Sequence, residues 1–154
     1  MNARDPAAFH PGPEATTIHL KPSADSMATL VHAFYADVRA HPLLGPVFEA
    51  ALHGRWDEHL ARLVDFWCTV ALGQRRFKGG DVFGKHMALS GITPAHFAAW
   101  VGLWQQHTSR LFAPDFAQEL QIAAHGIARN LFRGYFGAEP AFAEARERDT
   151  APHG

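Results

Sequence analysis

His86 lies in a setting that could present a single metal ligand. It follows a glycine-rich stretch, precedes Ser90-Gly91 and has the apolar neighbours Phe83, Met87 and Leu89. One imidazole on a brief helix facing an apolar cavity is a way to hold haem iron. The alternative is a histidine that lies at the surface or caps a helix. A three-ligand zinc site would need distant positions, because the sequence has no HExxH or other close histidine pair.

His59 shares one face of a predicted helix with apolar residues. Leu63, Phe66 and Val70 follow it by four, seven and eleven positions, which is helical spacing. A histidine on such a stripe is either a hydrogen-bonded core or edge residue, or part of a ligand pocket. The sequence contains eleven histidines, and we expect most of them to be exposed.

Tyr35 lies in the same apolar stripe as Val31 and Val38, so its phenol is predicted to point inward. A buried tyrosine hydroxyl needs a hydrogen-bond partner, which is either a backbone carbonyl or a ligand in a pocket. The 12 Phe, 4 Trp and 2 Tyr are many for 154 residues and indicate a large core or an apolar pocket.

Two other patterns carry little chemistry. Residues 79–85 fit the start of a phosphate-binding loop, but no strand is predicted before them and His86 stands where magnesium binding needs a hydroxyl. Cys68 lies between Trp67 and Thr69 inside a predicted helix, so we expect a buried packing residue rather than a nucleophile. As the single cysteine, it also excludes an intramolecular disulfide and a CxxC site.

The composition favours one globular domain in a reducing compartment. Hydrophobic residues make up 47% of the chain and charged residues 19%, and the formal net charge of −1 argues against non-specific nucleic-acid binding. No apolar run reaches the length of a membrane span, and the N-terminal residues do not form the apolar core of a secretory signal. We therefore expect a cytoplasmic protein that binds neither nucleic acid nor membranes.

Apolar residues at three- and four-residue intervals predict an all-α fold. Residues 1–22 predict a flexible arm and residues 137–154 a flexible tail, which leaves one domain at 23–136. Ser23 or Asp25 can cap the first helix, Gly73 ends the third, and Thr93-Pro94 opens the fifth. The predicted helices cover 23–40, 46–52, 55–72, 83–89, 94–112 and a last helix that begins at 114.

With Tyr35, His59 and His86 in this order, together with Phe48 and Trp100, the chain resembles the truncated haemoglobins, specifically the third group of that family. The resemblance extends from about Ala33 to Leu131, and order and spacing agree across several separate motifs. The matching stretches are 34–39 (FYADVR), 41–48 (HPLLGPVF), 56–59 (WDEH), 65–67 (DFW), 85–89 (KHMAL) and 92–100 (ITPAHFAAW).

The resemblance implies a two-over-two helical sandwich around haem b, with His86 as the iron ligand. It also implies that Phe48 wedges against the haem and that Tyr35, His59 and Trp100 surround a bound gas. The other pocket residues that it implies are Leu63, Phe66, Trp67, Phe77, Leu89, Phe97, Leu103 and Ile127.

The implied function is reversible binding of dioxygen and other diatomic gases, among them nitric oxide and carbon monoxide, by a bacterial haem protein. The alternative is a haem enzyme for nitric oxide dioxygenation or a peroxidase-like reaction. Such turnover would need an external reductase, because the chain offers no flavin or nicotinamide domain.

The chain departs from the family's pattern at two positions. Phe77 stands where a tyrosine is expected near a haem propionate, and Ser90 stands where a proline is expected after the proximal helix. Neither departure touches the predicted ligand set. The residues that could bind the haem propionates are Arg75, Arg76, Lys78 and Lys85, and the sequence does not select among them.

Overall fold

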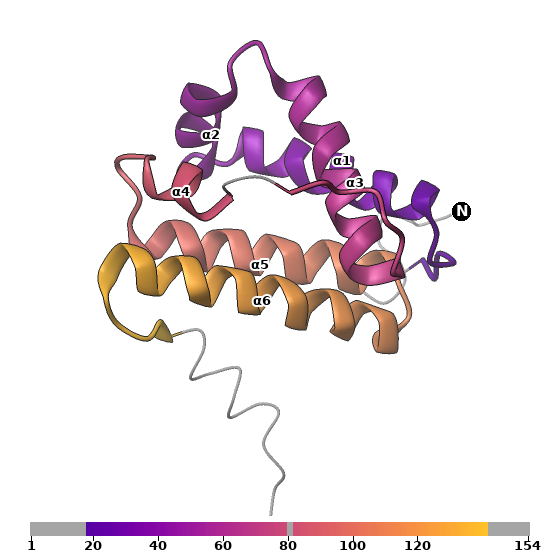
Figure 1. Ribbon diagram of the computed structural model, residues 1–154. Helices are drawn as coiled ribbons and strands as arrows, with labels where there is room; N and C mark the ends of the chain where they lie inside the picture. Colours follow the sequence, from indigo (N-terminus) through magenta and orange to yellow (C-terminus); the bar gives the residue numbers. More distant parts are fainter. Residues whose placement is uncertain (1–17, 80–81, 142–154) are drawn as a thin grey trace, which may run out of the picture.

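The computed structural model describes residues 18–79 and 82–141, and this part of the chain contains six helices and no strand (Figure 1). The all-α prediction is therefore confirmed. Residues 1–17 of the predicted arm and 142–154 of the predicted tail lie outside the described residues. The helices are α1 (Ala24–Ala40), α2 (Leu44–Leu52), α3 (Trp56–Leu72), α4 (Val82–Met87), α5 (Pro94–Leu111) and α6 (Pro114–Phe136).

The four long helices form two layers. Figure 1 shows α5 and α6 side by side, with α1 and α3 on the other side of the molecule. Helix α1 packs against α2, α3 and α5, whereas the short α4 packs against α6. The segment before α1 lies along the C-terminal end of α5. The backbone N–H groups of Ile18 and Leu20 donate to the carbonyls of Arg110 and Leu111.

Local sequence signals set the helix ends. Ser23 caps α1 through its hydroxyl, which accepts from the backbone N–H of Ser26 at 3.0 Å, while Ser26 Oγ accepts from the N–H of Ser23 at 2.9 Å. Gly73 ends α3 with φ 71°, a left-handed conformation that favours glycine. Pro94 and Pro114 each open a helix, where a missing N–H costs no intrahelical hydrogen bond.

Most of the predicted apolar positions of α1 and α5 are buried, as expected for two helices at the centre of the fold. Seven residues of α1 are buried: Ser26, Met27, Leu30, Val31, Phe34, Tyr35 and Val38. Cys68 is also fully buried, which agrees with the predicted packing role. Val70 lies on the same helical stripe as His59, Leu63 and Phe66 but is 45% exposed near the end of α3.

The expectation that most histidines are exposed is wrong for the described residues. Only His19, His32 and His53 are exposed there. His96 is buried because its Nδ1 accepts from the backbone N–H of Thr93 at 3.0 Å, which completes the start of α5. His107 is buried because its Nε2 lies 2.7 Å from Asp37 Oδ2 on α1. Helix capping and helix pairing therefore account for these two side chains.

Candidate functional site

Tyr35 lies where α1, α2 and α3 meet. It is 6% exposed, and its ring is surrounded by aromatic side chains from all three helices. The ring centroids of Phe48, His59 and Trp56 lie 5.8, 6.2 and 6.3 Å from that of Tyr35. The structure therefore brings together three side chains that the sequence predicts for one pocket, namely Tyr35, Phe48 and His59.

Trp100 of α5 lies next to this group, because its ring centroid is 5.7 Å from that of Phe34 and its side chain acts on the pKa of Tyr35. Burial raises the pKa of Tyr35 to about 12, and the Trp100 side chain opposes this rise only in part. An indole nitrogen can only donate a hydrogen bond, whereas a phenol can both donate and accept one.

An aromatic stack holds the Trp100 ring in place. Trp100 and Trp104 are stacked with an interplanar angle of 1° and centroids 6.2 Å apart, and Trp67 stacks on Trp104 at 4.5 Å. Trp104 is fixed in turn by its indole N–H, which donates to the carbonyl of Leu120 at 3.0 Å. Trp67 is buried in this stack, so it supports the pocket from the core side.

His59 and His86 come from α3 and α4 and are both half-buried. Burial lowers the pKa of His59, and the charges of His86, Arg62 and Arg55 lower it further. His86 therefore acts on His59 although the two residues belong to different helices. The lowered pKa favours the neutral form of His59, in which one ring nitrogen can accept a hydrogen bond.

The short helix α4 is attached to α6 at His86, the predicted iron ligand. The hydroxyl of Tyr135 donates to the backbone carbonyl of His86, which also accepts from the N–H of Leu89 at 3.0 Å. Tyr135 packs on Phe97, with ring centroids 5.8 Å apart. No sequence pattern indicates this role of Tyr135, because it lies 49 positions from His86.

The remaining predicted pocket residues fall into two groups. Leu63, Phe66, Phe77, Leu89, Leu103 and Ile127 are half-buried. Phe97 is instead buried in a second cluster between α5 and α6, 5.3 Å from Phe132. The predicted propionate partners are all exposed: Arg75, Arg76, Lys78 and Lys85. The structure does not distinguish among these four.

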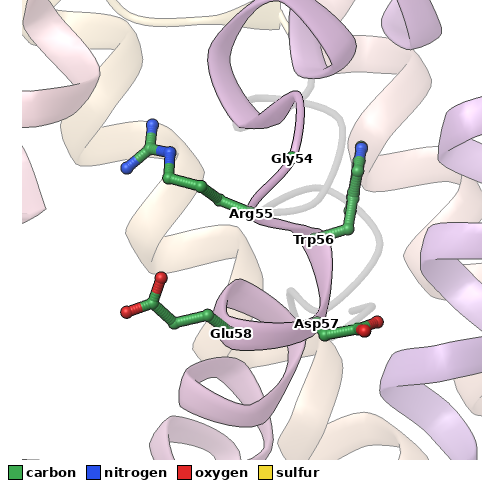
Figure 2. A pocket seen from close by; sticks show the side chains of 5 residues that line it. All are labelled: Gly54, Arg55, Trp56, Asp57 and Glu58. Carbon is green, nitrogen blue, oxygen red and sulfur yellow. The ribbon is translucent and has the colours of Figure 1, made fainter.

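An open hollow of about 400 Å³ lies at the turn between α2 and α3, lined by Gly54, Arg55, Trp56, Asp57 and Glu58 (Figure 2).

No group of three or more His, Cys, Asp or Glu side chains within residues 18–79 and 82–141 could hold a metal ion. In the same part of the chain, no helix is long and apolar enough to cross a membrane.

Comparison with known proteins identifies one relative by sequence and one by structure. No family model matches the chain. A group 3 truncated hemoglobin of Campylobacter jejuni is 28% identical over 119 residues, which cover 73% of this chain and 93% of that protein. The crystal structure of group III truncated hemoglobin from Campylobacter jejuni matches with a TM-score of 0.71 and 24% identity, covering 78% of this chain and 96% of that one. The chain therefore has the fold of a truncated globin, and its resemblance to the group III truncated haemoglobins is confirmed.

Proposed function

We propose that this chain binds haem b through His86 and reversibly binds dioxygen and other diatomic gases beside Tyr35, His59 and Trp100. One observation carries the proposal. The rings of Tyr35 on α1 and His59 on α3 lie 6.2 Å apart between centroids, and the side chains of Trp100 on α5 and His86 on α4 lower the pKa values of Tyr35 and His59 respectively.

The side chains present fit a haem group. His86 can supply one imidazole ligand from a short helix, which is sufficient because a porphyrin provides the other nitrogen ligands. Half-buried apolar side chains of α2, α3 and α6 pack against the core cluster and keep one side exposed: Phe48, Leu63, Phe66 and Ile127. A flat apolar cofactor needs apolar surface of this kind.

Haem iron, when bound, supplies the site at which a diatomic gas is held. The protein would contribute the other functions. His86 would bind the iron as a neutral imidazole, and the contact of Tyr135 with its carbonyl anchors α4 to α6. The Tyr35 hydroxyl would donate its hydrogen to the gas.

The polar groups should favour dioxygen over carbon monoxide. Bound dioxygen is strongly polarised and gains from a hydrogen-bond donor, whereas carbon monoxide is less polarised and gains less. The aromatic rings around Tyr35 exclude water, which strengthens this donor, because a low local dielectric makes a hydrogen bond stronger.

Absorption spectroscopy of the full chain after addition of haemin tests the proposal. We expect a Soret band, a shift on reduction and a further shift with carbon monoxide. His86→Ala should lose the haem or need added imidazole to keep it, whereas the matched change His32→Ala at an exposed position of α1 should leave the spectra unchanged. The absence of a Soret band would support a helical domain without haem. Normal haem content in His86→Ala would refute the ligand assignment.

A further inference from the structure

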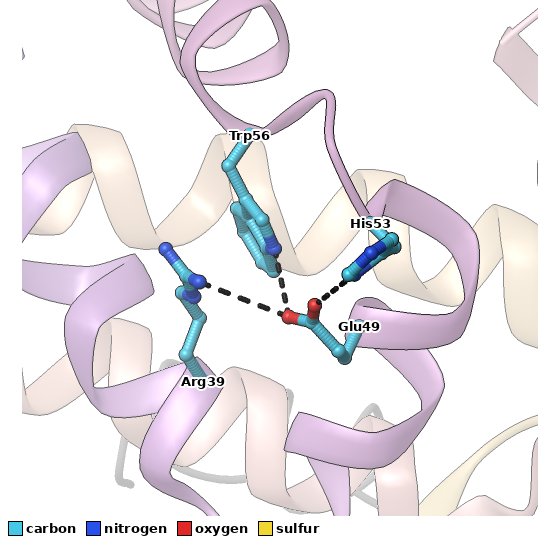
Figure 3. A network of polar contacts seen from close by, with 4 residues as sticks. All are labelled: Arg39, Glu49, His53 and Trp56. Carbon is cyan, nitrogen blue, oxygen red and sulfur yellow. Dashed lines mark hydrogen bonds and ion pairs between the residues drawn. The ribbon is translucent and has the colours of Figure 1, made fainter.

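Trp56 is held by a polar network at the junction of α1, α2 and α3 (Figure 3). Its indole N–H donates to Glu49 Oε1 at 2.9 Å, and the Arg39 guanidinium carbon lies 4.4 Å from the centre of the Trp56 ring. The ring is therefore fixed at its edge by a carboxylate and on its face by a cation. These three residues come from three different helices.

The Glu49 carboxylate is itself held in place by two further contacts. His53 Nδ1 lies 2.9 Å from Oε2, and an Arg39 nitrogen lies 3.8 Å from Oε1. Hydrogen bonds with His53 and Trp56 lower the pKa of Glu49, so the carboxylate is charged at neutral pH. One carboxylate thus joins α1, α2 and the first residue of α3.

Trp56 lies between the open hollow and the residues of the proposed gas site. It is one of the residues that line the hollow (Figure 2). Its ring also contacts Tyr35 and His59, with centroids 6.3 and 6.5 Å away. Only 7% of Trp56 is exposed, so its indole is buried against these two side chains although the residue borders the hollow.

We propose that Glu49 is a positioning residue that holds Trp56 closed against Tyr35 and His59, and that release of this indole sets how fast a gas passes between the hollow and the site. The inference rests on the proposed function, because it concerns access to the same gas site. Glu49 acts through Trp56 and does not itself touch the gas.

The kinetic consequence separates access from affinity. A barrier on the path slows entry and exit by the same factor, so its removal leaves the equilibrium constant unchanged. It also acts alike on dioxygen and carbon monoxide, because passage depends on size more than on polarity. Loss of the donor at Tyr35 would instead change dissociation, and mainly that of dioxygen.

The test compares gas kinetics of the haem-loaded full chain and its variants, with association measured by flash photolysis and dissociation by stopped-flow mixing. We expect Glu49→Ala to raise both rates by about threefold to tenfold for both gases, with affinity unchanged, since a hydrogen bond to a charged group is lost at a half-exposed site. Glu49→Gln keeps an oxygen that accepts the indole N–H and should restore most of the original rates. Glu58→Ala removes a carboxylate at the same hollow and should change neither rate by more than about twofold.

A second comparison keeps the proposal testable if Glu49→Ala folds poorly. Trp56→Phe removes the indole N–H and part of the ring, so it should also raise both rates. Adding Glu49→Ala to Trp56→Phe should then change nothing further, because the carboxylate acts through the indole. Unchanged rates in both single variants with normal haem spectra would overturn this inference alone. Absence of haem binding by the unmodified chain would overturn the proposed function and this inference together.

Discussion

Replacing Tyr35 by phenylalanine removes one hydroxyl and little else. The centroid of the Tyr35 ring lies 4.7 Å from that of Phe34, in an edge-on contact, and 5.8 Å from that of Phe48. A phenylalanine ring can make both contacts. Tyr35 is buried, and burial raises the pKa of its hydroxyl more than the Trp100 side chain lowers it. The variant therefore tests the donor that the proposed function assigns to bound dioxygen.

The expected effect follows from the strength of a hydrogen bond to a polarised acceptor. Such a bond contributes roughly 1.5–3 kcal/mol, which corresponds to dioxygen dissociation that is about 10- to 100-fold faster. Trp100 cannot easily take over as donor, because its ring is stacked on Trp104 at 1° and would have to leave the stack. We therefore expect no recovery by a shift of the indole.

Stopped-flow displacement of dioxygen from the ferrous, haem-loaded chain measures this rate. Carbon monoxide dissociation from the same variant is the internal control and should change by less than about threefold, because this gas is less polarised. Equal acceleration of both gases would indicate a steric effect. The role of the Tyr35 hydroxyl as a hydrogen-bond donor would then be refuted.

Three further predictions concern packing at two glycines, the attachment of α4 to α6, and the loss of stability at high pH. Gly45→Ala should lower the unfolding free energy by about 1–3 kcal/mol in a denaturant titration, because the new Cβ would lie 2.5 Å from a carbonyl oxygen of α1. Gly126→Ala, with no atom within 4 Å, should instead raise it by roughly 0.5–1 kcal/mol. Tyr135→Phe should speed transfer of haem to an excess apoglobin by about threefold to tenfold, because the His86 carbonyl loses a donor; an unchanged rate would contradict the anchoring role. Burial raises the pKa of Tyr35 to about 12, so the folded state keeps the phenol proton to higher pH than the unfolded chain does. The stability that this proton provides is therefore lost as the pH rises from 10 to 12. The unmodified chain should lose about 3 kcal/mol more across this window than Tyr35→Phe, and parallel pH profiles would show that Tyr35 is not protected.

The helices were predictable because each one carries its signal locally. Ser23, Gly73 and Pro94 mark ends that the structure confirms within a residue or two. The exposed Val70 shows the limit of this reasoning, since a stripe on a helix predicts a buried face only as far as a neighbouring helix covers it. The second helix begins at Leu44, two residues before the predicted start at Pro46, because His41 Nδ1 accepts from the backbone N–H groups of Leu43 and Leu44 at 3.0 and 3.3 Å.

The candidate site was predictable only where residue type and spacing carried the information. Tyr35, His59 and Trp100 lie on apolar stripes or in motifs that resemble those of the family, and the resemblance implies that all three surround one ligand. Glu49 and Tyr135 gave no such signal, because their roles arise where helices cross. The hydrogen bond from Trp56 to Glu49 depends on how α2 meets α3, and no periodicity within either helix encodes that crossing.

The position of Trp100 beside Tyr35 has a chemical consequence. Burial raises the pKa of Tyr35, and the Trp100 side chain opposes this rise in part. A neighbour that lowers the pKa of a phenol also makes its hydroxyl a stronger hydrogen-bond donor. The stack of Trp100 on Trp104, with an interplanar angle of 1°, holds the indole in the position from which it acts on Tyr35. The effect of Trp100 on the phenol therefore depends on a side chain of the core.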